Sequence, residues 1–127
     1  MSDVDAEPRR WDFYVRDMIE FCEKVTSYTN GLNQAAFVAA ELTYDASLRN
    51  IELIGEAATH VPRAVRDAHP EIPWSAIIGT RNRIIHAYLG VDNDVIWTII
   101  QDAIPTMLPR LRALLDEVEG GMTAHGA

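Results

Sequence analysis

Hydrophobic residues recur every three or four positions through most of the chain, which is the spacing of amphipathic helices. A first helix is predicted up to Asn30-Gly31, and its apolar stripe consists of Trp11, Val15, Met18, Cys22 and Val25. A second, longer helix is predicted from Asn33, a residue type suited to capping, to Pro62. Its apolar face contains Phe37, Tyr44, Leu48, Ile51, Gly55 and Ala58.

The spacing of amphipathic helices continues through the second half of the chain. Residues 63–68 predict a short connecting helix, and Pro73 suits the first turn of a third main helix that Gly90 closes. Asp92 and its polar neighbours predict the cap of a fourth, which Pro105 and Pro109 should bend and Gly120-Gly121 should end. The apolar stripe of that fourth helix consists of Val95, Ile96, Ile99, Ile100, Ala103, Met107, Leu111, Leu114 and Val118.

These elements predict one all-α domain, an up-and-down bundle of four main helices plus a short connecting helix. The domain covers residues 1–120, and residues 121–127 are expected to form a disordered tail. At 127 residues the chain has the usual size of a single domain with one core.

Composition limits the classes of function. The net charge of −8 argues against a broad electrostatic footprint for nucleic acid, so any RNA chemistry must rely on a local cluster. The single cysteine, Cys22, excludes an internal disulfide framework and sits on an apolar face, which favours a buried structural thiol. No apolar run is long enough to span a membrane, and no signal peptide is evident. We therefore expect a cytoplasmic protein without a membrane partner.

One charged residue falls on an apolar face. At about 100° per residue, Arg81 lies close to the centre of the third helix's stripe, beside Ile85. A guanidinium directed at the core needs an acidic partner, because an unpaired buried charge is costly. The candidates are Glu52 and Glu56 on the second helix. An entirely structural role for Arg81, as such an ion pair, is one interpretation.

Two further polar residues of this segment share a different face. Asn82 and His86 are four positions apart and can touch, whereas Arg81 and His86 point about 140° apart on an ideal helix. The helix could distort near Gly79, could end before His86, or the site could be completed by a second copy of the chain. We favour the second copy, and therefore predict a homodimer. Its interface should include the third helix and part of the fourth, with Trp97 as an aromatic anchor.

The residue types suit RNA cleavage by the RNA's own 2′-hydroxyl. A histidine can move the proton near neutral pH, an arginine can hold the phosphate oxygens as charge develops, and an asparagine can orient either group. A metal site is a weak alternative because the histidines, at positions 60, 69, 86 and 125, lack ligand spacing. The glycines are isolated, so no phosphate-binding loop and no cofactor are implied.

The chain resembles the HEPN-domain toxins of the HepT type. The R-x-x-x-x-H-x-Y pattern of that family matches Arg81, His86 and Tyr88, with its favoured polar residue at Asn82. The segments LRNIELIGEAA (48–58), IPW (72–74) and IIGTRNRIIHAY (77–88) also look like family signatures in the expected order.

This resemblance implies a homodimeric, metal-independent endoribonuclease whose arginines and histidines face each other across the dimer cleft. It further implies a type VII toxin–antitoxin system, in which a small nucleotidyltransferase of the MntA type neutralises the toxin by attaching AMP to the motif tyrosine, here Tyr88. AMP would add bulk and negative charge where RNA must enter. The alternative is a weakly or non-catalytic HEPN binding module that the nucleotidyltransferase docks on and modifies, or that binds a nucleotide.

Overall fold

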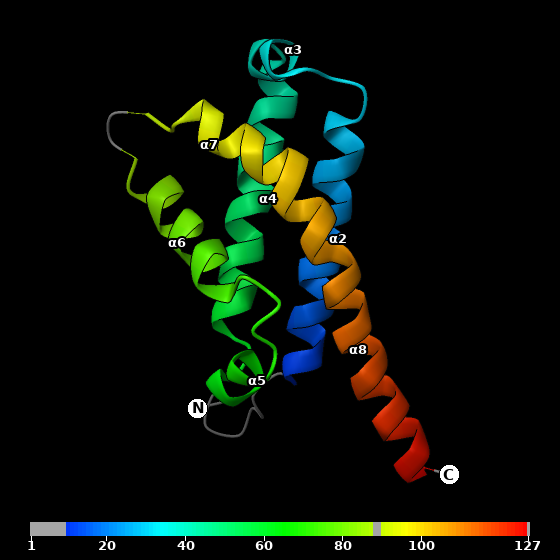
Figure 1. Cartoon of the computed structure of the whole chain (residues 1–127). Helices are drawn as coiled ribbons and strands as arrows, with labels where there is room; N and C mark the ends of the chain where they lie inside the picture. The colour runs from blue at the N-terminus through cyan, green and yellow to red at the C-terminus, as the bar shows by residue number, and fades with distance from the viewer. Residues whose placement is uncertain (1–9, 88–89, 127) are drawn as a thin grey trace, which may run out of the picture.

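Four long helices form the body of the protein. A computed structural model describes the backbone of residues 10–87 and 90–126, and the side chains as far as residue 120. The long helices are α2 (Trp11–Thr29), α4 (Glu41–Thr59), α6 (Trp74–Ile85) and α8 (Ile104–Gly126). They run alternately up and down in Figure 1, and the described residues contain no β-strand. The predicted all-α bundle of four main helices is therefore confirmed, while the homodimer stays a prediction.

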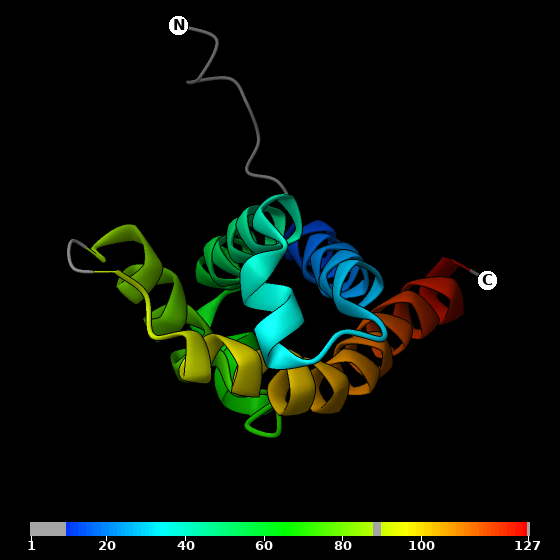
Figure 2. The ribbon, with the colours of Figure 1, turned by 90° about the horizontal axis from the view of Figure 1, so that it is seen from above.

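Shorter elements connect these helices. They are α3 (Gln34–Ala39), α5 (Arg63–Ala68), α7 (Asn93–Thr98) and a π-helical turn, η1 (Ile99–Ala103). The short connecting helix predicted at residues 63–68 is present as α5. Seen from above, α3 lies across the end of the bundle between α4 and the α7–α8 segment (Figure 2).

The core lies where α2, α4 and α8 meet, and α6 packs on the outer side of α4. On α2, the side chains of Val15, Met18, Cys22 and Val25 are completely buried, as the apolar stripe predicts. Each such aliphatic side chain contributes roughly 1.5–3 kcal/mol relative to an exposed one. Burial also raises the pKa of the Cys22 thiol to about 12, so Cys22 is the inert core residue that was expected.

The second predicted helix is in fact two. Asn33 caps α3 as predicted, since its Oδ1 accepts a hydrogen bond from the Ala36 amide at 2.8 Å. The chain then breaks at Ala40, where ψ is 85°, and α4 begins at Glu41. The break lets α3 turn over the end of the bundle and bury Phe37 completely. Nothing in the residue type of Ala40 signals this break.

The third predicted helix ends early. Pro73 precedes the first residue of α6, and the Trp74 indole Nε1 donates to the His69 carbonyl at 3.0 Å, which fixes the start. α6 ends at Ile85 rather than at Gly90. The His86 amide still donates to the Asn82 carbonyl, but the His86 backbone, with ψ of 24°, leaves the helical path.

The fourth predicted helix is divided by the π turn. Asp92 caps α7 as predicted, with its Oδ1 accepting from the amides of Asp94 and Val95. A π turn holds more residues than an α turn and rotates the side chains that follow it. Ile104, 1% exposed, therefore joins the core in place of Ala103, which the regular stripe had placed there. Pro105 falls in the first turn of α8, directly after the π turn, and Pro109 lies inside α8 without ending it.

α8 continues to Gly126, past the Gly120-Gly121 pair at which a helix end was predicted. Two glycines weaken a helix by about 1 kcal/mol each but do not forbid it. Of the described helices, none is both long enough and apolar enough to cross a membrane.

Candidate functional site

Arg81 points from α6 towards α4. Gly55 of α4 makes room for it, because a Cβ at Gly55 would lie 2.3 Å from the Arg81 Cβ. The Arg81 Nη2 is 2.6 Å from the Glu56 Oε1, and 29% of the arginine side chain remains exposed. The predicted salt bridge between Arg81 and the second main helix is therefore present. The other candidate, Glu52, pairs with Arg49 at 2.8 Å instead, three positions away on the same helix.

A second contact holds the other side of the guanidinium. The Arg81 Nη1 donates to the Asn82 Oδ1 at 2.9 Å, which turns the amide of Asn82 towards the arginine. The Arg81 Nε is buried and has no hydrogen-bond partner within the part of the chain that the structure describes. An unpaired buried donor is unfavourable, so this N–H can gain from an incoming acceptor.

His86 lies at the end of α6 and is exposed. Across residues 10–87 and 90–120, no hydrogen bond or ion pair connects its ring to Arg81. The helix does end before His86, which was one of the possible ways to bring the two residues together. Within one copy of the chain, however, this early end of α6 does not bring His86 into contact with Arg81.

An open pocket of about 590 Å³ lies between the end of α6 and the start of α7. Asn82 and His86 both line it, whereas Arg81 does not. The described residues that line it are Thr80, Asn82, Arg83, Ile84, His86, Ala87, Gly90, Val91, Asp92, Val95 and Ile96. The structure thus places two of the three predicted catalytic residues in one pocket and connects the third to it through the Arg81–Asn82 hydrogen bond.

Two residues at the site were not singled out from the sequence. Arg83 shares the pocket with His86, and the signal that could have found it is their spacing of three positions, which puts both on one helix face. His60 contacts the second carboxylate oxygen of Glu56 at 3.3 Å and stacks on Tyr14, so Glu56 lies between His60 and Arg81. The i,i+4 spacing of Glu56 and His60 is the corresponding signal.

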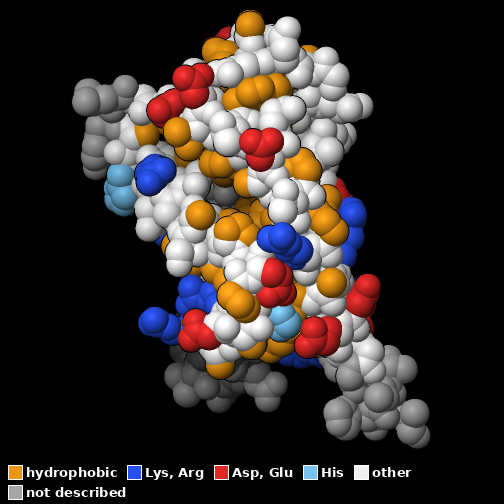
Figure 3. Space-filling view, viewed as in Figure 1, with side chains coloured by type: hydrophobic (Ala, Val, Ile, Leu, Met, Phe, Trp, Pro, Cys, Tyr) orange, Lys and Arg blue, Asp and Glu red, His pale blue; other side chains and the backbone are white. Residues whose placement is uncertain are grey.

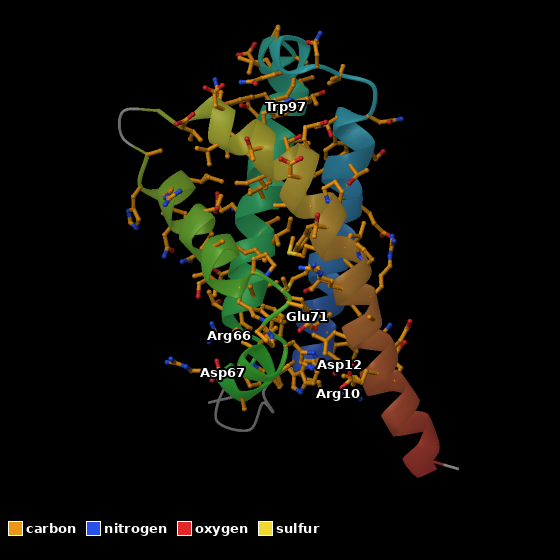
Figure 4. All side chains as sticks on the ribbon, viewed as in Figure 1. Arg10, Asp12, Arg66, Asp67, Glu71 and Trp97 are labelled. Atoms are coloured by element: carbon orange, nitrogen blue, oxygen red, sulfur yellow. The ribbon has the colours of Figure 1, made fainter. Side chains whose placement is uncertain are left out.

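Two other residues were predicted to have roles, Tyr88 and Trp97. Tyr88, the expected site of AMP attachment, lies outside the described residues. Trp97, the expected interface anchor, is half-buried in its own chain and packs on Phe37 with ring centroids 5.3 Å apart. Figure 4 shows Trp97 at the end of the bundle where α3, α4 and α7 meet.

A smaller, apolar groove lies along α6 and shares the residue Thr80 with the pocket. It has a volume of about 110 Å³ and lies between α4, α6 and the η1–α8 segment. Its walls include Ile77 and Thr80 of α6 and Ile99 and Ala103 of η1. On the face shown in Figure 3, hydrophobic side chains gather in the space between α6 and the helix that runs from α7 to α8.

Potential metal ligands are scattered. Among the side chains that the structure describes, no three from His, Cys, Asp and Glu come together closely enough to hold a metal ion.

Comparison with known proteins places this arrangement in a family. A sequence model of the family described as "Ribonuclease HepT-like" matches residues 18–114. A protein of Thermococcus cleftensis named "Probable ribonuclease HepT" is 34% identical over 101 residues, which are 80% of this chain and 92% of that protein. A protein of Caldanaerobacter subterraneus subsp. tengcongensis named "Putative RNase" is 31% identical over 104 residues, which are 82% of this chain and 93% of that protein.

No solved structure matches the chain. The family match covers most of α2, all of α4 and α6, and the segment from Arg81 to His86. The chain therefore belongs to the HepT-like ribonuclease family.

Proposed function

We propose that the chain is the toxin of a type VII toxin–antitoxin pair, an endoribonuclease that cleaves RNA without a metal ion. The observation that carries the proposal is the placement of Asn82 and His86 in one open pocket, with Arg81 hydrogen-bonded to Asn82. Membership of the HepT-like ribonuclease family supports RNA as the substrate.

The proposed reaction is attack of the 2′-hydroxyl oxygen on the adjacent phosphorus. His86 takes the proton of the hydroxyl, the new P–O2′ bond forms, and the P–O5′ bond breaks. The leaving 5′ oxygen takes a proton from a second histidine, and the products are a 2′,3′-cyclic phosphate and a 5′-hydroxyl end. Arg81 binds the non-bridging oxygens as negative charge builds up, and Asn82 orients Arg81 through its side-chain oxygen.

The second histidine in this proposal belongs to a second copy of the chain. Within one copy Arg81 faces Glu56 on α4 while His86 lies on the pocket side of α6, so a composite site needs a dimer. The apolar groove beside α6 gives a second copy a surface to cover, next to the pocket. The proposed two-fold axis therefore runs beside α6, which brings two arginines and two histidines together.

We further propose that a nucleotidyltransferase of the MntA type silences the toxin by attaching AMP to Tyr88. Tyr88 follows His86 by two residues in the sequence. An attached AMP carries a phosphate, whose negative charge repels the RNA backbone, and its bulk occupies space that the RNA needs.

A second candidate function is a HEPN binding module with little cleavage of its own. Two observations favour it: the net charge of −8 is unfavourable for RNA, and both Nη atoms of Arg81 already have partners. The module would be held and modified by the nucleotidyltransferase, or would bind a nucleotide.

The decisive experiment incubates purified protein with total RNA in the presence of EDTA. Wild type should cleave, while His86→Ala and Arg81→Ala should each lower the rate by about a hundredfold or more. Arg63→Ala is the matched control, because this arginine lies on α5 with 86% of its side chain exposed and should leave cleavage unchanged. Circular dichroism and sedimentation confirm that each variant still folds and assembles as wild type does.

A second comparison separates the two candidates. Tyr88→Phe removes only the hydroxyl that would carry AMP, so cleavage should persist while the nucleotidyltransferase no longer silences the protein. If wild type and His86→Ala are equally inert on every RNA tested, yet Tyr88 accepts AMP, the binding module replaces the ribonuclease.

A further inference from the structure

We propose that Arg83 binds a backbone phosphate of the RNA substrate, and that the pocket between α6 and α7 holds one nucleotide of the strand. This inference rests on the proposed ribonuclease function and adds a substrate-binding residue to it.

Most of the described arginines of this acidic protein form ion pairs with carboxylates, and Arg83 does not. The arginines that form ion pairs with carboxylates are Arg10, Arg16, Arg49, Arg63, Arg81 and Arg112. Arg83 is exposed and, within the described residues, its side chain forms neither an ion pair nor a hydrogen bond. All five N–H donors of its guanidinium are therefore available to a ligand.

The position of Arg83 relative to His86 fits one substrate. Three positions separate them, so the two side chains lie on neighbouring parts of one face, and both line the pocket. Arg81 is five positions from His86 and is held by Glu56 and Asn82. Within a single copy of the chain, the arginine that shares the pocket of the histidine is thus Arg83.

The pocket has the size and the walls that one nucleotide requires. Its volume of about 590 Å³ falls within the usual range for small-ligand sites, roughly 300–1,000 Å³. Ile84, Val91 and Val95 provide apolar surface on which a base can lie, while Arg83 and His86 provide the polar side. A planar guanidinium suits this arrangement because it can bind two phosphate oxygens at once.

Among the described residues that line the pocket, one is acidic, and this residue, Asp92, forms no ion pair with Arg83. The Asp92 Oδ1 accepts hydrogen bonds from the amides of Asp94 and Val95, at 3.0 and 3.3 Å, at the start of α7. These bonds hold the Asp92 carboxylate at the helix terminus, where the partial positive charge of the peptide dipoles offsets it. The charge of Arg83 is therefore not paired with the Asp92 carboxylate, the one acidic group among the described residues of the pocket.

Arg83 also lies in the last turn of α6, where a cation stabilises a helix through the same dipole effect. A merely structural role would show as a loss of stability without a change in RNA affinity. The two roles can therefore be separated by measuring both properties on the same variants.

The test measures binding of a short single-stranded DNA, which lacks the 2′-hydroxyl and so cannot be cleaved by this route, together with cleavage of the RNA of the same sequence. Arg83→Gln should lower the affinity about tenfold, because one charge-assisted contact is lost. The slope of log affinity against log salt should decrease in magnitude by about 0.7, the value for one phosphate on a single strand. KM for cleavage should rise with kcat changed less than threefold or so, since the chemistry of His86 is untouched.

Two further variants control this test. Arg83→Lys keeps the charge and should retain the wild-type salt slope, whereas Arg63→Gln removes a remote, exposed charge and should leave affinity unchanged. If Arg83→Gln binds the strand as wild type does, or if Arg63→Gln weakens binding equally, the phosphate site is refuted although cleavage continues. If wild type cleaves nothing but binds the DNA strand in an Arg83-dependent way, the ribonuclease proposal fails and the phosphate site stands.

Discussion

Replacing Gly55 by alanine should destabilise the protein, although alanine normally favours helices. Gly55 is buried in α4 directly under α6. A Cβ at this position would lie 2.3 Å from the Arg81 Cβ and 2.9 Å from the Ile77 carbonyl oxygen. Both neighbours are fixed to the backbone of α6, so neither can rotate away. The alanine methyl group must therefore push α6 away from α4.

The expected magnitude is the difference between two opposing contributions. In a helix interior, alanine stabilises the folded state by about 1 kcal/mol relative to glycine. Overpacking a close helix contact typically costs 1–3 kcal/mol, and a clash with backbone belongs at the upper end. The net loss of unfolding free energy should thus be about 2 kcal/mol. The displacement of α6 should also weaken the 2.6 Å contact between Arg81 and Glu56.

Urea unfolding followed by circular dichroism measures this difference. Gly79→Ala is the matched control, because Gly79 lies in α6 and, apart from its own stretch of helix, no described atom lies within 4 Å of the position of its Cβ. That variant should gain stability, by up to about 1 kcal/mol. The reasoning is refuted if Gly55→Ala is as stable as Gly79→Ala, since the two helices would then not be held together through this contact.

Three other perturbations have defined outcomes. Because burial raises the pKa of Cys22 to about 12 from an ordinary 9.0, the unfolded thiol ionises first as the pH rises. The stability of wild type relative to Cys22→Ala should therefore fall by about 1.4 kcal/mol between pH 8 and pH 10 in urea titrations, and a pH-independent difference would contradict this. Glu56→Gln should lower RNA cleavage by roughly tenfold or more through misplacement of Arg81, while unfolding free energy changes by less than about 1 kcal/mol because the pair is partly exposed. Phe37→Ala should cost about 3–5 kcal/mol and alter the fluorescence of Trp97, whose ring packs against it at a tilt; an unchanged emission spectrum would disagree with the packing.

The parts of the fold that depend on local physical chemistry could be predicted from the sequence. Asn33 and Asp92 act as helix caps because their side-chain oxygens reach amides a few residues ahead, which needs no tertiary contact. The pairing of Arg81 with Glu56 followed from a charge on an apolar face and the acids available on the neighbouring helix. The family was correctly recognised, and with it the ribonuclease class, from three ordered sequence segments.

The parts that depend on packing between distant segments could not be predicted. The break at Ala40 exists because α3 folds over the end of the bundle, and no residue near it disfavours a helix. The end of α6 at Ile85, rather than at Gly90, has no signal in residue type, although Asn82 and His86 line one pocket as their spacing predicts. Ile104 rather than Ala103 is buried in the core because of the π turn, and a π turn has no reliable signature in residue type. The catalytic roles of Arg81, Asn82 and His86 stay predictions.

The π turn at Ile99–Ala103 also gives the chain a place to change its length. It holds one residue more than an α-helical turn would, so deletion of one residue there can convert it into a regular helix with no loop to repair. The orientation of α7 relative to α8 would stay nearly the same, because the π turn covers about the angle of an α turn with one residue more. Only the turn itself, including Ile99 and Ala103 in the wall of the groove beside α6, would change its surface. Single-residue gaps at this point in alignments of relatives would therefore mark proteins with a different surface next to α6 and an unchanged contact between α2 and α8.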